Sequence, residues 1–144
     1  MNIIKIKPHH FLDIIKLHGF GFEQFVPDPA YKHDFYRVGN KILKNKKQIL
    51  FLTKKPDSIC QPCIFLINAA KCGDNNKEEW NQTIDSRLLE ALNLHEGSEI
   101  RATDFCCLIN KLTDKELTHI YRERDEKETK KRIFFLRKGI TKYL

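Results

Sequence analysis

Two short segments in the first 52 residues have an apolar pattern that is typical of strands. Residues 3–6 read IIKI and alternate weakly between apolar and polar, whereas residues 49–52 form a compact apolar run, ILFL. Weak alternation predicts a half-buried strand, and a short apolar run between turn residues predicts a buried one. We therefore expect strands near residues 3–7 and 48–53 to pair in one small sheet.

Helical spacing dominates the remaining sequence. Pro8 suits the first turn of a helix, where its missing N–H has no partner to lose, and Gly19 suits the C-cap of that helix. Thr113 and Glu116 have the spacing of a capping box, which predicts the start of one long final helix. Apolar spacing predicts further helices over residues 31–43, 64–70 and 78–92, and from residue 103. We therefore expect a helix-dominated α+β fold with a two-stranded sheet and a cysteine-bearing loop, forming one domain over residues 1–144.

The composition favours a cytoplasmic protein that does not contact membranes. The chain has 144 residues, of which 41% are hydrophobic and 31% charged, with a formal net charge of +7. No stretch approaches the roughly 20 apolar residues needed to cross a bilayer, and the first residues lack the apolar segment of a signal peptide. Lysines are spread along the chain and mixed with acidic residues, so the charge favours surface solubility and argues against nucleic acid as a partner.

Three of the five cysteines lie close together in sequence. Cys60 and Cys63 form a Cys-x-x-Cys pair, and Cys72 follows nine residues later in a turn rich in Gly and Asn. In a reducing compartment, clustered cysteines more often bind metal or do redox chemistry than form structural disulfides. Thiolates are the ligands that iron–sulfur clusters and zinc prefer. The spacing therefore predicts a metal centre, with iron–sulfur and zinc both open.

Two alternatives use the same cysteines differently. A thiol–disulfide oxidoreductase of the thioredoxin kind needs a cis-proline later in the chain, and no proline follows Pro62. A structural zinc site needs four ligands, and it would staple the loop to the first helix and leave a basic surface for a partner or nucleic acid. Cys106 and Cys107 are adjacent, so on a helix their side chains diverge by about 100°. Cys106 fits the core, whereas Cys107 remains a candidate ligand.

The second cluster of polar residues lies at the start of the first predicted helix. His9 and Asp13 are at i,i+4, and His10 and Asp13 are at i,i+3, so the three side chains can converge on its first turn. Without a functional role, the histidines would be ordinary polar residues at a helix N-terminus. On the helix predicted at 78–92, Asp85 and Arg87 are either functional polar residues or an exposed pair, and we favour the exposed pair.

Taken together, the two clusters resemble the domain-of-unknown-function family 1284, whose members are often labelled as predicted iron–sulfur binding proteins. The resemblance covers roughly the first half of the chain, and the matching residues are Pro8, His9, His10, Leu12, Gly19, Gly21, Asp57, Ile59, Cys60, Cys63 and Cys72. In the family pattern a cysteine often stands where this chain has Asp13. A proline often follows the second loop cysteine, where this chain has Ile64. The resemblance implies a metal cluster but no established reaction.

We therefore expect an iron–sulfur protein of the [4Fe–4S] type, with Cys60, Cys63 and Cys72 as thiolate ligands. Asp13 or His10 would bind the fourth iron, and Cys107 is a further candidate. Such an iron would act in electron transfer or as a Lewis acid on a small molecule. His9 or His10 would shuttle protons, because imidazole titrates close to neutral pH. The partner would be a small molecule or a redox protein, and the sequence names neither.

Overall fold

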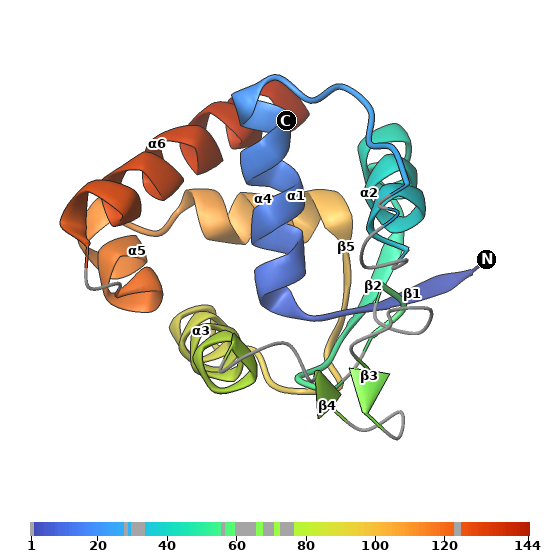
Figure 1. The fold of residues 1–144 in the computed structure, drawn as a ribbon, viewed down its shortest axis with the longest axis horizontal. Helices are drawn as coiled ribbons and strands as arrows, with labels where there is room; N and C mark the ends of the chain where they lie inside the picture. The colour runs from blue at the N-terminus through green and yellow to red at the C-terminus, as the bar shows by residue number, and fades with distance from the viewer. Residues whose placement is uncertain are drawn as a thin grey trace.

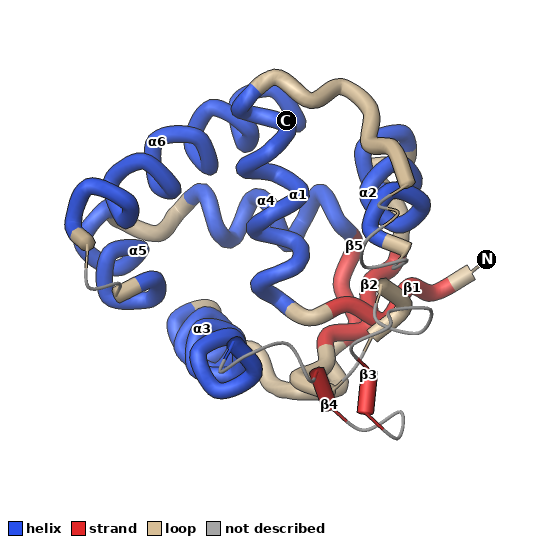
Figure 2. The backbone as a smooth tube through the Cα atoms, in the orientation of Figure 1, coloured by secondary structure: helices blue, strands red, loops and turns tan. Residues whose placement is uncertain are grey.

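The computed structural model describes residues 2–27, 29, 34–55, 57–59, 66–67, 71–72, 77–122 and 125–144, with the backbone alone for 66–67, 71–72 and 77–78. Helices make up most of this part, and the strands gather on one side (Figures 1 and 2). The helix-dominated α+β fold is thereby confirmed. The strands are β1 (Ile3–Ile6), β2 (Ile49–Leu52), β3 (Leu66–Ile67), β4 (Lys71–Cys72) and β5 (Glu99–Arg101). The helices are α1 (Pro8–Phe20), α2 (Phe35–Lys44), α3 (Lys77–Ala91), α4 (Ala102–Asn110), α5 (Asp114–Tyr121) and α6 (Glu126–Tyr143).

The main sheet has β2 at its centre. β2 pairs in parallel with β1, placing Ile4 opposite Leu50 and Ile6 opposite Leu52, and all four side chains are buried. The predicted pairing of these two strands is confirmed. Because parallel neighbours cannot be joined by a tight turn, the chain crosses between them through α1 and α2. The expectation of a two-stranded sheet is wrong, because β2 also pairs antiparallel with β5 on its other edge and the sheet has three strands. β5 is too short to show an alternating pattern in the sequence.

Helices α1 and α6 pack against each other at two glycines. A Cβ atom added to Gly139 would overlap the carbonyl oxygen of Ile15, and one added to Gly19 would overlap the backbone of Gly139. The prediction that Gly19 caps α1 is wrong, because the helix continues to Phe20. Gly21 is the C-cap, with a φ of 129°. Gly19 is therefore needed for the close approach of two helix backbones.

The C-terminal region contains two helices in place of the predicted single one. The capping box is confirmed, since Thr113 Oγ1 accepts from the Glu116 N–H at 3.1 Å and Glu116 Oε1 accepts from the Thr113 N–H at 3.0 Å. The C-cap of α5 is Arg122, whose φ of 25° is left-handed. The Asp125 side chain then accepts from the Lys127 N–H and caps the start of α6. No apolar residue occurs between Tyr121 and Ile133. Because this stretch has no apolar periodicity, the sequence pattern does not reveal the break between the two helices.

The remaining helix predictions have mixed outcomes. α3 and α4 confirm the helices expected at 78–92 and from 103. α2 begins at Phe35, and residues 31–33 lie outside the described residues. The prediction of a helix at 64–70 is wrong for residues 66–67, which form a strand that pairs antiparallel with residues 71–72. The apolar run is too short for its periodicity to distinguish a helix from a strand. Among the described helices, none is long and apolar enough to cross a membrane.

The glycine contact between α1 and α6 predicts a steep stability loss for Gly139→Ala. The added methyl group would have to push apart two backbones, so we expect a destabilisation of about 3 kcal/mol, measured by urea unfolding. Thr141→Ala, at an exposed position of the same helix, is the control and should change stability by less than about 0.5 kcal/mol. Wild-type stability in Gly139→Ala would show that the helices do not cross this closely.

Candidate functional site

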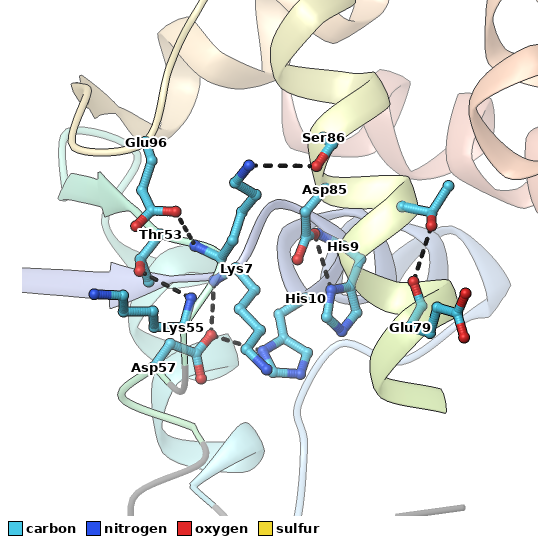
Figure 3. Close-up of polar contacts among 12 residues, drawn as sticks. Lys7, His9, His10, Thr53, Lys55, Asp57, Glu79, Asp85, Ser86 and Glu96 are labelled. Carbon is cyan, nitrogen blue, oxygen red and sulfur yellow. Dashed lines mark hydrogen bonds and ion pairs between the residues drawn. The ribbon is translucent and has the colours of Figure 1, made fainter. Parts of the chain in front are cut away.

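Two buried carboxylates lie at the N-terminus of α1 (Figure 3). The first N–H groups of a helix have no partner within it and form the positive end of its dipole. Asp85, from the middle of α3, accepts from the His9 N–H at 2.7 Å, and Asp57, from the turn after β2, accepts from the Lys7 N–H at 2.7 Å. Segments 50 and 76 residues away in sequence thus supply the negative groups that this helix end requires.

The same carboxylates bind the two histidine rings. His9 Nδ1 lies 2.9 Å from Asp85 Oδ1, and His10 Nδ1 lies 2.7 Å from Asp57 Oδ2. Because an ionised carboxylate only accepts hydrogen bonds, Nδ1 carries the proton in each ring and Nε2 is the remaining ring nitrogen. The rings are neighbours, with centroids 4.3 Å apart. Two imidazoles are therefore held in fixed orientations, each with one nitrogen left for a ligand or a proton.

Asp57 also holds the turn that leads into the cysteine segment. Its Oδ1 accepts from the Ile59 N–H at 3.0 Å. Ser58 bonds to β1 in both directions, since its N–H donates to the Lys5 carbonyl at 3.0 Å and its Oγ accepts from the Lys5 N–H at 3.2 Å. Cys60 follows Ile59 directly in the chain. Ile59, the residue before the first cysteine, is thus hydrogen-bonded to Asp57, the carboxylate that also binds the His10 ring.

The predicted cysteine ligands lie mostly outside the described residues. Cys60 and Cys63 are not described, and Cys72 is described by its backbone in β4, where it pairs with Leu66. The meeting of the three sulfurs therefore stays a prediction. Within the described ranges, no three His, Cys, Asp or Glu side chains form a group that could hold a metal ion. β4 contacts α3, the helix that carries Asp85.

The two adjacent cysteines of α4 differ in burial, as the sequence predicts. Cys106 is a buried core residue, and burial raises the pKa of its thiol to about 12, so the thiol remains protonated near neutral pH. A protonated thiol is a poor metal ligand, because the thiolate is the form that binds. Cys107 is exposed.

The expectation of an exposed Asp85–Arg87 pair is wrong. Asp85 is fully buried, and Arg87 lies next to the end of α5, where its guanidinium donates to the Ile120 carbonyl at 3.4 Å. A signal for Asp85 was present in the sequence. It precedes Leu88 and Leu89 by three and four residues, which places it on the apolar face of α3.

The charges around His10 raise its pKa. Burial by itself lowers the pKa of this imidazole, but the charge of Asp57, its hydrogen bond and the charge of Asp13 together outweigh that effect. The charge of Lys7 acts in the lowering direction. Asp13 itself is partly exposed and lies 3.6 Å from the Lys16 ammonium. The role of Asp13 as a metal ligand stays a prediction.

Asp85 has one oxygen without a partner. Its Oδ2 is buried and accepts no hydrogen bond within the described part of the chain. Buried polar atoms are nearly always hydrogen-bonded, by protein groups or by an ordered water or ligand. Both hydrogen bonds that the structure gives this carboxylate fall on Oδ1.

The fold and site define a helix-dominated α+β protein with two buried histidine–carboxylate pairs at one helix N-terminus. The family model "Protein of unknown function (DUF1284)" matches residues 28–123, and the chain belongs to this family. The matched range includes both carboxylates and all three loop cysteines, whereas the two histidines precede it. Neither the curated proteins nor the solved structures contain a match.

The raised pKa of His10 predicts a measurable change in Asp57→Asn. In the metal-free wild type, the His10 pKa measured by NMR titration should lie above the ordinary value of about 6.5, and it should fall in the variant because the carboxylate charge is lost. A pKa raised by folding adds stability at pH values below the unfolded value, and this stability is lost as the pH rises through the folded value. The stability of wild type should therefore decrease over that range, and the decrease should be smaller in Asp57→Asn.

Asp85→Asn is the matched control for this titration, because it alters the carboxylate that binds His9 and leaves the Asp57–His10 contact intact. The His10 titration should persist in it. A His10 pKa that does not respond to the loss of Asp57 would show that the two groups are not in contact.

Proposed function

We propose that this protein binds an iron–sulfur cluster of the [4Fe–4S] type through the thiolates of Cys60, Cys63 and Cys72, with His10 Nε2 as the fourth ligand. Metal-binding histidines almost always donate their other ring nitrogen to a carboxylate or carbonyl, which fixes the ring and increases its basicity. The Asp57–His10 contact has this arrangement, with Nδ1 donating to a fully buried carboxylate.

One observation carries the proposal, namely that Asp57 binds both the His10 ring and the turn before Cys60. Its Oδ2 accepts from the ring and its Oδ1 accepts from the Ile59 N–H. The expected imidazole ligand and the start of the cysteine segment are therefore attached to the same buried group. Asp13 is a weaker candidate for the fourth position, because it is partly exposed and pairs with Lys16.

The donor set suits a soft metal centre. Thiolates are the usual ligands of iron–sulfur clusters, and histidine replaces cysteine at some of them. Three thiolates and one imidazole also make a closed tetrahedral zinc site, so zinc is the second candidate. When bound, the cluster would supply a redox-active centre or a Lewis-acidic iron.

The second histidine gives the proposed centre a polar neighbour. His9 is fixed by Asp85 through its backbone N–H and its ring, and its ring centroid lies 4.3 Å from that of His10. Its free nitrogen can exchange a hydrogen bond with a small molecule beside the centre.

Metal analysis after strictly anaerobic purification tests the proposal. We expect brown protein with stoichiometric iron and acid-labile sulfide, whose colour is lost in air. A colourless, air-stable protein with stoichiometric zinc would select the zinc site instead. Protein that holds neither metal after reconstitution with iron and sulfide would refute the metal centre.

Substitutions then identify the ligands. Cys63→Ala should lose the metal, and Asp57→Asn should weaken metal retention about 10- to 100-fold because the ring of His10 is no longer fixed. Cys107→Ala, which removes an exposed thiol on α4, is the matched control and should keep full metal content. Circular dichroism of each variant separates loss of metal from loss of fold. Loss of metal in Cys107→Ala with retention in His10→Ala would assign the fourth position to Cys107.

A further inference from the structure

Helix α6 presents a row of lysines to solvent on the side opposite its apolar face. Lys127, Lys130, Lys131, Phe134 and Lys138 are all exposed, and we call them the lysine stripe. At 100° and 1.5 Å per residue they cover about 100° of the helix surface over about 16 Å. Glu126 and Glu128 flank the first turn of the stripe, and no acidic residue occurs in the sequence after Glu128.

Other cations of α6 have partners, whereas those of the lysine stripe lack acidic ones. Arg137 pairs with Asp114 at 2.9 Å, and Lys142 pairs with Glu23 and donates to the His18 carbonyl at 2.9 Å. In the part of the chain that the structure describes, no stripe lysine forms an ion pair, and the Lys138 ammonium lies 5.2 Å from the centre of the Phe134 ring. The stripe therefore has unneutralised positive charge beside an aromatic face.

Exposed aromatic rings extend the lysine stripe toward the end of α1. Phe134 is 49% exposed, and its ring contacts Phe135, which in turn contacts Phe20. Phe20 is 56% and Phe22 46% exposed, and their rings stack with centroids 6.3 Å apart. Exposed apolar groups gathered in one place usually mark an interaction surface.

We propose that the lysine stripe binds single-stranded nucleic acid, with its lysines on the phosphates and the exposed phenylalanine rings stacked on bases. Positive charge along a line with aromatic faces beside it is the combination by which proteins bind single strands without reading their sequence. The four lysines lie within twelve residues of the sequence, and the helical turn of α6 places them on one exposed face.

Other partners fit the stripe less well. The apolar face of α6 is buried in the core through Ile133, Leu136 and Ile140, so a membrane would receive little more than the ring of Phe134 from this helix. α6 also lies at the opposite end of the molecule from β3 and β4 (Figure 1). A redox protein docked there would be far from β4, the strand that contains Cys72.

Fluorescence anisotropy with a labelled 20-nucleotide oligothymidine and the full-length protein tests this proposal. We expect binding that weakens with salt, with a slope of log K against log salt near −3 for four lysines. Lys130→Glu/Lys131→Glu should weaken binding at least tenfold, and Phe134→Ala should weaken it about fivefold or more. The matched control is Lys41→Glu/Lys44→Glu, which makes the same charge change at exposed positions of α2 and should weaken binding much less.

The outcomes separate the proposal from its alternatives. Equal weakening in the two double variants would show that net charge alone drives binding and would overturn it. Equal affinity for a duplex of the same length, together with no effect of Phe134→Ala, would also overturn the proposal. Preferential binding to vesicles containing phosphatidylglycerol would overturn it as well. Metal content is measured in every variant and should not change, because α6 lies at the opposite end of the molecule from β4.

Discussion

The structure depends on two buried carboxylates placed at the N-terminus of one helix. Asp57 and Asp85 are almost without solvent exposure, and burying an ionised carboxylate costs several kcal/mol unless charge and hydrogen bonds compensate for it. The N–H groups and dipole of α1 and the rings of His9 and His10 supply that compensation. The turn after β2 and the middle of α3 are thereby attached to the same helix end.

Helix α1 connects this site to the rest of the molecule. β1 positions its first turn beside the sheet, and the glycine contact with α6 fixes its last two turns. The same contact turns the apolar face of α6 inward and the lysine stripe outward. The histidine–carboxylate pairs lie at the N-terminal end of α1, whereas α6 packs against its C-terminal part.

Membership of DUF1284 supplies no activity, so the chemistry has to come from the residues. The match covers the carboxylates and the cysteines but begins after the histidines. The site joins these two parts of the chain, because each histidine is held by a carboxylate from the matched region. A metal centre built this way would take ligands or their supports from α1, the turn after β2 and the cysteine segment.

Elements whose signals are local could be predicted from the residues alone. Dihedral preferences and side-chain spacing over a few residues predict Pro8 at the start of α1, the Thr113 capping box and the strands β1 and β2. Which groups meet depends on the packing of the whole chain. The Asp85–His9 pair spans 76 residues, Gly19 is explained by a helix that begins more than 100 residues later, and the lysine stripe exists only because α6 packs by its opposite face. Such contacts depend on how apolar faces pack together, and local spacing contains no information about the partner.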